Sequence, residues 1–400
     1  MENPKATLPI HPPHRWTGPS APMKRPKEIA CFSYTPSHEY RPDASGLRYY
    51  YPPRLGADLC KGFETFEKLD ESTDDHLESL LRTIVGVERE RGGRCEADVV
   101  TWRGMMTKLL ACPFEDRDGF EMNATFYQGT IYIEESHEYK AQRQARQSRV
   151  QTAPGRPSQD MMSYWGYKFE TLSLLPDTWD ATSREYIEGR EEQIVNNAAQ
   201  YCSVVQTGIG DTSLIIGGEI DAIRDLTTPP SLGLQTPPPT SQTNFVELKT
   251  SLDPSSPRDL QAFERKLLKF WLQSFLLGVP KIIVGFRSAN GQLRRLEELE
   301  TAKIPGIVKK RGGWDGNVAV NFGAGVLSFL KGTVNSEGVW RIRRGERSGV
   351  VECWKVEEVG HGGILSEEFI NWRVKLALKE RGQGEVQSEV QSEGQEGGEA

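Results

Sequence analysis

Two short segments place charged residues at every second position, between apolar neighbours. The first is Glu219-Ile220-Asp221, and the second is Phe245-Val246-Glu247-Leu248-Lys249. Because side chains alternate between the two faces of a β-strand, each segment predicts a strand with one charged face and one apolar face. The chain must therefore form a sheet that buries Ile220 and Leu248 and gathers the charged side chains on the other face.

An acid-x-acid strand beside an acid-x-Lys strand is typical of metal-dependent nucleases, which hold a divalent cation against a phosphate. Alternating charged and apolar residues also describe any half-exposed sheet face, and either tripeptide alone favours that simpler interpretation. Two such strands, the second followed closely by a long helix, favour the metal site.

The acidic residues of these strands also predict which ion is bound. If Glu219, Asp221 and Glu247 converge at ~5 Å, each pair repels by ~3 kcal/mol at an effective dielectric constant of about 20. Protons or a cation must compensate this repulsion. All six histidines and all six cysteines lie outside the two segments. Ligation by oxygen alone favours Mg²⁺ or Mn²⁺ and argues against zinc.

Net charge and composition exclude several classes of protein. The chain of 400 residues has a net charge of −7, of which residues 381–400 contribute −4. A body so close to neutral does not hold nucleic acid through bulk positive charge, so a nucleic-acid substrate requires a local site. The six cysteines form no CxxC pair and predict free thiols in a reducing compartment. No apolar run approaches the ~20 residues that span a bilayer, so we expect no membrane partner.

The distribution of proline and polar residues predicts a single catalytic domain with unstructured ends. Seven prolines in residues 1–28 predict a flexible arm without regular structure, and residues 29–380 form the expected domain. Residues 140–160 are polar and predict a mobile loop. Residues 226–243 contain five prolines and predict an insertion, and the acidic, low-complexity residues 381–400 predict a disordered tail.

Both helices and strands are predicted inside the domain. Ser256-Pro257 is typical of a helix start, and the helix is expected to run to about Leu277. Residues 120–127 and 130–134 alternate around Gln128-Gly129, which predicts a β-hairpin. The mixture predicts an α/β mixed (α+β) fold of twisted mixed sheets flanked by helices.

An ordered set of short segments accompanies the two charged strands. These segments are Asp58-Leu59-Cys60-Lys61-Gly62-Phe63, Thr101-Trp102-Arg103-Gly104, Tyr164-Trp165-Gly166-Tyr167-Lys168-Phe169-Glu170, Phe270-Trp271-Leu272-Gln273-Ser274 and Gly313-Trp314-Asp315-Gly316-Asn317. No single segment is specific, but in this order the chain resembles the DXO-type RNA decapping nucleases from about Ser33 to Trp372. It is most similar to the nuclear member in fungi that accompanies the nuclear 5′–3′ exoribonuclease.

The resemblance implies a divalent-metal site, with Mg²⁺ or Mn²⁺ as the cofactor. Glu170 closes the Gly-x-x-x-Glu motif of the family, which begins here at Gly166. Glu219 would act through metal-bound water or a second ion. The implied metal ligands are Glu170, Asp221, Glu247 and the main-chain carbonyl of Leu248.

The resemblance also implies contacts with the substrate. Lys249 and Gln273 would contact the scissile phosphate, Arg103 the terminal phosphates, and Glu170 would lie in the same substrate site. Without the resemblance, the simpler interpretation of Gln273 is a buried polar residue with a hydrogen-bond partner. The simpler interpretation of Arg103 is an arginine on the surface or in an ion pair.

The function that follows is hydrolysis at the 5′ end of RNA in the nucleus. The family would remove 5′-triphosphate as pyrophosphate and release incomplete or non-standard caps, including NAD caps. A general metal-dependent nuclease is one alternative. A non-catalytic partner that stabilises the exoribonuclease is another, although the complete set of acidic residues argues against it.

Overall fold

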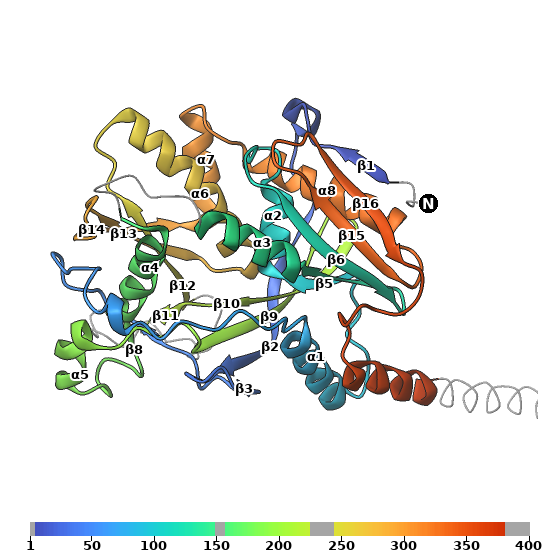
Figure 1. The fold of residues 1–400 in the computed structure, drawn as a ribbon, viewed down its shortest axis with the longest axis horizontal. Helices are drawn as coiled ribbons and strands as arrows, with labels where there is room; N and C mark the ends of the chain where they lie inside the picture. The colour runs from blue at the N-terminus through green and yellow to red at the C-terminus, as the bar shows by residue number, and fades with distance from the viewer. Residues whose placement is uncertain (1–4, 149–156, 225–243, 381–400) are drawn as a thin grey trace, which may run out of the picture.

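The structure is a computed structural model that describes residues 5–148, 157–224 and 244–380. Two mixed β-sheets with helices around them confirm the predicted fold class (Figure 1). The expected insertion at 226–243 and the expected tail at 381–400 lie outside the described residues. The predicted limits of the catalytic domain stay a prediction.

The larger sheet contains ten strands of the described chain. Its spatial order is β1 (Ala6–Pro9), β16 (Val350–Glu357), β15 (Val339–Arg344), β6 (Phe120–Tyr127), β7 (Thr130–Glu135), β5 (Val99–Trp102), β10 (Thr212–Glu219), β9 (Gln200–Ile209), β2 (Met23–Tyr34) and β3 (Tyr40–Arg41).

The smaller sheet has six described strands. Its order is β14 (Leu293–Glu300), β13 (Lys281–Arg287), β12 (Phe245–Leu252), β11 (Ala222–Arg224), β4 (Tyr49–Tyr50) and β8 (Leu174–Leu175). In Figure 1, β13 and β14 lie on the opposite side of the molecule from β1, β15 and β16.

Helices cover the sheets. They are α1 (Glu78–Arg91), α2 (Arg103–Ala111), α3 (His137–Ser148), α4 (Gln159–Ser173), α5 (Arg184–Glu188), α6 (Pro257–Leu277), α7 (Ile304–Lys310), α8 (Gly316–Thr333) and a C-terminal helix described over 367–380. None of the helices in the described ranges is both long enough and apolar enough to cross a bilayer.

Alternation along β10 shows that the larger sheet is buried on both faces. Leu214 and Ile216 belong to a core shared with α2, α6 and α8, whereas Ile215 packs with α1 and the C-terminal helix. The first core also includes Ile282 of β13, so one hydrophobic core joins the two sheets. A strand buried on both faces reads as a continuous apolar run, as Leu214–Ile216 does.

Local signals fix the ends of the elements that border the predicted site. The Ser256 hydroxyl accepts a hydrogen bond from the Asp259 N–H at 3.2 Å and caps α6, as predicted. Gly278, with φ 74°, ends that helix in the left-handed conformation. The predicted hairpin is confirmed as β6 and β7.

The prediction that residues 1–28 lack regular structure is wrong for the described part of this segment. β1 pairs antiparallel with β16 through Leu8 and Val351, and β2 begins at Met23. An edge strand tolerates prolines because one of its sides needs no hydrogen bonds, so proline density alone misled the prediction.

The expected loop over 140–160 is also partly wrong, because residues 140–148 belong to α3 and 159–160 to α4. Polar side chains hold α3 in place through hydrogen bonds and not through packing in a hydrophobic core. Lys140 and Gln144 both bind the Glu71 carboxylate, at 2.9 and 3.0 Å.

The N-terminal segment predicts a stability effect at Trp16. Its indole N–H donates to the Ile10 carbonyl at 2.9 Å, and its ring meets Phe322 edge to face at 5.2 Å. Trp16→Ala should lower the free energy of unfolding by about 2 kcal/mol. This loss is smaller than the loss expected for a fully buried tryptophan, because the Trp16 ring is half-buried. Urea unfolding measures the effect, with His14→Ala as the exposed control. Equal stability of Trp16→Ala and wild type would show that Trp16 does not hold the N-terminal segment against the rest of the domain.

Candidate active site

The predicted site residues come from five separate elements. Arg103 begins α2, Glu170 lies in the last turn of α4, and Gln273 lies on α6. The acidic and basic residues of the two charged segments are carried by β10, the β10–β11 link and β12: Glu219, Asp221, Glu247 and Lys249.

The site lies where the larger sheet passes into the smaller one. β10 ends at Glu219 in the larger sheet, and β11 begins at Ala222 in the smaller sheet. The interpretation of Glu219-Ile220-Asp221 as one regular strand is therefore wrong, because the chain leaves the first ladder after Glu219. Ile220 is buried as predicted, and the charge of Asp221 still contributes to the raised pKa of Glu219.

Two cations join the carboxylates into one network. The Arg103 guanidinium donates from Nη1 to Glu247 Oε2 at 3.0 Å. The Lys249 ammonium lies 2.6 Å from Glu247 Oε1 and 3.8 Å from Asp221 Oδ2. The side chain of Glu247 is fully buried, and that of Asp221 is 5% exposed, so these ion pairs are shielded from water.

The main chain of Leu248 contributes to the same network. Its N–H donates to Asp221 Oδ2 at 2.6 Å, in the place where a neighbouring strand would otherwise pair. The N–H and C=O of one strand residue point to the same side of the strand. The Leu248 carbonyl is therefore on the side of Asp221, which agrees with the role that the family resemblance gives it.

Burial and mutual repulsion raise the pKa values of three carboxyl groups. Burial, followed by repulsion from Asp221, raises the pKa of Glu219 to about 7. Burial and then Glu247 raise the pKa of Asp221 to about 6, although the Leu248 N–H opposes the shift. Glu170 has its pKa raised well above the ordinary value, by burial first and then by Asp221 and Glu219.

Glu247 is the exception among the acids. Its burial would raise its pKa, but the charges of Arg103 and Lys249 outweigh burial and hold the pKa below the ordinary value. The reciprocal effect appears in the cations. Burial alone would lower their pKa values, yet Glu247 and Asp221 keep those of both Lys249 and Arg103 raised.

The donor set fits a hard divalent cation. When fully ionised, the four carboxylates carry −4 and the two cations +2, which leaves −2 in a partly buried space. One divalent ion would neutralise this charge without protons. Glu170, Asp221, Glu247 and the Leu248 carbonyl offer oxygen ligands only, which suits Mg²⁺ or Mn²⁺.

Two glycines let the elements of the site approach one another, and the sequence patterns gave them no role. A Cβ atom on Gly218 would lie 2.9 Å from Arg103 Cβ, so only glycine lets β10 pack against the start of α2. A Cβ atom on Gly285 of β13 would lie 2.5 Å from the Phe169 ring, next to Glu170. Glycine inside an apolar strand is the signal that identifies such close approaches.

Gln273 lies on α6, beside a cavity that none of the four carboxylates lines. It lines this cavity of about 210 Å³ together with Gly104 and Thr107 of α2, and the same cavity is bordered by Lys269 and Arg344. The Gln273 side chain, which is predicted to contact the substrate, therefore borders a cavity. Gly104, which follows Arg103 in the sequence, lines the same cavity. The contact of Gln273 with the substrate stays a prediction.

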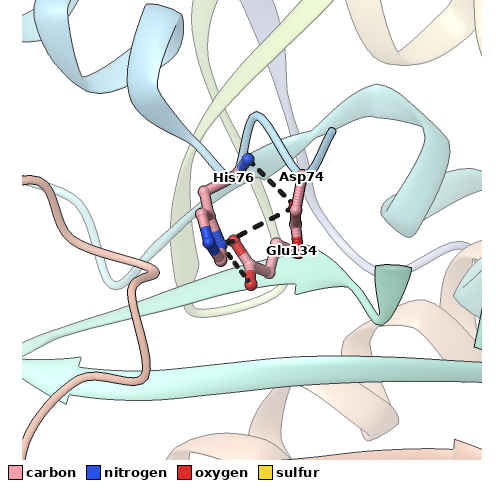
Figure 2. A group of neighbouring side chains, drawn as sticks. All are labelled: Asp74, His76 and Glu134. Atoms are coloured by element: carbon pink, nitrogen blue, oxygen red, sulfur yellow. Dashed lines mark hydrogen bonds and ion pairs between the residues drawn. The ribbon is translucent and has the colours of Figure 1, made fainter. Parts of the chain in front are cut away.

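A second group of possible ligands lies elsewhere, on the loop before α1 and on β7 (Figure 2). His76 Nδ1 is 3.0 Å from Glu134 Oε1 and 3.7 Å from Asp74 Oδ1, and Asp74 also accepts the His76 N–H. Three potential ligand atoms lie within 4.8 Å of one another. Because these groups already satisfy each other, the cluster is explained as an ion-pair network that fixes the loop to β7.

The raised pKa values predict that divalent cations bind more tightly as pH rises. Glu219 and Asp221, with pKa values of about 7 and 6, hold protons in mildly acidic solution, and a cation must displace them. Mn²⁺ affinity should therefore rise from about pH 5.5 to about pH 7.5 and then level off. In the unfolded chain these groups ionise at their ordinary pKa values of 4.5 and 3.8, so their raised pKa values should cost the metal-free fold stability as pH rises from about 4 to about 7.

Titration calorimetry in two buffers of different ionisation enthalpy measures both the affinity and the protons released. Asp221→Asn should weaken binding and reduce proton release, whereas Asp211→Asn, in the exposed turn before β10, should change neither. An affinity independent of pH would contradict the protonated state of these carboxyl groups.

Comparisons with known proteins identify the family. The family model for RAI1 like PD-(D/E)XK nucleases matches residues 24–370. The chain is 55% identical over 371 residues to the decapping nuclease RAI1 of Emericella nidulans, covering 92% of this chain and 99% of the relative.

Two solved structures share the fold. Candida albicans Rai1, in complex with pU5 and Mn²⁺, matches with a TM-score of 0.83 at 29% identity and covers 93% of this chain and 99% of its own. Scheffersomyces stipitis Rai1, in complex with (3′-NADP)+ and a calcium ion, matches with a TM-score of 0.83 at 27% identity and covers 92% and 100%. These findings confirm the resemblance, and the chain belongs to the RAI1-like PD-(D/E)XK nuclease family.

Proposed function

We propose that the protein is a divalent-metal-dependent decapping nuclease that acts on RNA 5′ ends. It removes 5′-triphosphate as pyrophosphate and releases incomplete or non-standard caps, including NAD caps. The observation that carries this proposal is the group of four carboxylates around two cationic side chains, in which Glu247 is fully buried and the other three are partly buried. The relative at 55% identity is named a decapping nuclease, which supports the same reaction class.

The side chains divide into those that hold a cation and those that hold the substrate. Glu170, Asp221, Glu247 and the Leu248 carbonyl are the proposed cation ligands. A bound Mg²⁺ or Mn²⁺ supplies charge for the phosphoryl oxygens and lowers the pKa of a water molecule, so that no histidine base is needed. Glu219 accepts a hydrogen bond from the attacking water and orients it.

Arg103 and Lys249 are the proposed phosphate contacts. Both cations pair with Glu247 in this structure, at 3.0 and 2.6 Å. When Glu247 holds a cation instead, these two side chains are free to bind phosphoryl oxygens. A guanidinium suits the two oxygens of a terminal phosphate, and an ammonium supplies a point charge at the scissile one. Gln273 donates to the same phosphate from the cavity beside α2.

Ligands in two solved structures of similar proteins support the proposed action on RNA 5′ ends and on NAD caps. The Candida albicans protein is in complex with a 5′-phosphorylated oligouridine and Mn²⁺, which is consistent with RNA in this site. The Scheffersomyces stipitis protein is in complex with a phosphorylated NAD derivative, which is consistent with NAD caps. We extend both ligand classes to this chain because the predicted ligands and phosphate contacts are all present here.

We also infer that the protein acts in the nucleus and binds the nuclear 5′–3′ exoribonuclease. This inference rests on the family resemblance alone. The interface with the exoribonuclease needs no metal, so binding and hydrolysis can be separated by mutation. A purely stabilising partner remains the alternative that this separation tests.

Asp221→Asn should abolish hydrolysis while preserving the fold. The variant keeps the side-chain volume but removes one cation ligand and one negative charge, so turnover should fall by at least about 100-fold. The assay follows release of pyrophosphate from 5′-triphosphate RNA, and of the cap from NAD-capped RNA, with Mn²⁺ or with EDTA. Asp211→Asn is the matched control, because Asp211 is an exposed aspartate in the turn before β10.

Each alternative has its own outcome. Retained hydrolysis by folded Asp221→Asn would remove this carboxylate from the mechanism. Equal cleavage of circular RNA, which has no 5′ end, would support a general nuclease. Exoribonuclease binding by the wild type without any hydrolysis would support the stabilising partner.

A further inference from the structure

A second cavity lies between the C-terminal helix and the turn that joins β6 to β7. Its volume is about 270 Å³, and it is lined by Arg94, Gln128, Arg373, Leu376, Ala377 and Glu380. None of these residues belongs to the candidate active site. Two arginines border one small space, although neither has a role in the reaction proposed above.

Arg373 is a buried arginine with donors to spare. The residue is 2% exposed, and its Nη2 binds Glu88 Oε1 at 2.8 Å. Its Nε and Nη1 atoms are buried and find no hydrogen-bond partner among the described residues. The Glu88 carboxylate is shared with other donors, because it also accepts the Cys95 N–H at 2.8 Å and the Trp372 indole N–H at 2.9 Å.

Arg94 brings a second guanidinium to the same cavity. Its Nη2 donates to the Gln128 carbonyl at 2.6 Å and to Thr130 Oγ1 at 3.0 Å, which fixes the side chain over the β6–β7 turn. Its Nε is buried without a hydrogen bond among the described residues and lies 3.5 Å from a Glu96 carboxylate that is 76% exposed. Solvent screens this weak pairing, so the charge of Arg94 is poorly compensated.

We propose that this cavity binds a phosphate-type oxyanion, held by Arg94 and Arg373. Buried guanidinium N–H groups without partners are unfavourable unless an acceptor reaches them. An oxyanion supplies several acceptors and a negative charge together, and arginine binds phosphate with two parallel hydrogen bonds. Glu380 also lines the cavity, but it is exposed and opposes the anion only through solvent.

Occupancy of the cavity would join three segments that are distant in the sequence. Arg373 belongs to the C-terminal helix, Arg94 follows α1, and Gln128 forms the turn between β6 and β7. An anion bound to both arginines holds the C-terminal helix against this turn. The oxyanion is therefore expected to protect residues 367–380 from amide hydrogen exchange.

Binding is measured on the full chain in EDTA, with inorganic phosphate as the probe and sodium chloride at equal ionic strength as the control. Without a divalent cation, the four carboxylates of the active site repel phosphate, so binding there does not interfere. Calorimetry and hydrogen exchange of residues 367–380 are the two readouts.

The variants Arg94→Met and Arg373→Lys should each weaken phosphate binding by at least about 10-fold. Arg373→Lys keeps a cation beside Glu88 but removes the two unpaired donor groups. Arg91→Met is the matched control, because it removes an exposed arginine that does not line the cavity, and binding should be unchanged. If Arg373→Lys fails to fold, Arg94→Met decides the question alone.

An RNA oligonucleotide with a 5′-hydroxyl end distinguishes the two sources of phosphate. Competition with inorganic phosphate would identify the RNA backbone as the occupant, and lack of competition would identify a free anion; the site stands in either case. The proposal is overturned if wild type shows no saturable binding of phosphate, or if Arg94→Met binds phosphate as tightly as Arg91→Met does.

Discussion

Four carboxylates, of which only Glu247 is fully buried, gather around two cationic side chains, and the chemistry of the site depends on this imbalance of charge. Ion pairs at 3.0 and 2.6 Å neutralise Glu247, whereas the pKa values of Glu170, Glu219 and Asp221 remain raised. Like charges are brought together out of water only when something compensates them, and protons leave Glu219 and Asp221 as pH rises through about 7 and 6. A hard divalent cation compensates them at neutral pH, which is why the site is best explained as a metal centre.

The fold holds this group together by joining two sheets at one point. The chain passes from β10 to β11 through Ile220 and Asp221, so Glu219 belongs to the larger sheet while Asp221 reaches Leu248 in the smaller one. Close packing at Gly218 and Gly285 then brings Arg103 and Glu170 to the same place. A larger residue at either glycine would push a charged side chain away from its partners and so disrupt the network.

The sequence predicted those parts of the molecule that depend on short-range patterns. The cap of α6, the β6–β7 hairpin and the strand that carries Glu247 and Lys249 follow from local rules of capping, turns and alternation. The edge strand β1 and the helix α3 could not be predicted in this way, because pairing with β16 and contacts with Glu71 stabilise them. Within the site, alternation predicted the acidic faces, but only the resemblance to a family connected Arg103, Glu170 and Gln273 with them. Their meeting depends on tertiary packing that no spacing in the sequence records.

Anomalous diffraction from crystals soaked with Mn²⁺ tests most directly whether the buried carboxylates form a metal centre. The account predicts an anomalous peak in contact with Asp221, Glu247 and the Leu248 carbonyl. It also predicts that Arg103 no longer pairs with Glu247 in that crystal. A peak only beside Asp74, His76 and Glu134, with the ion pairs of Glu247 unchanged, would contradict the account.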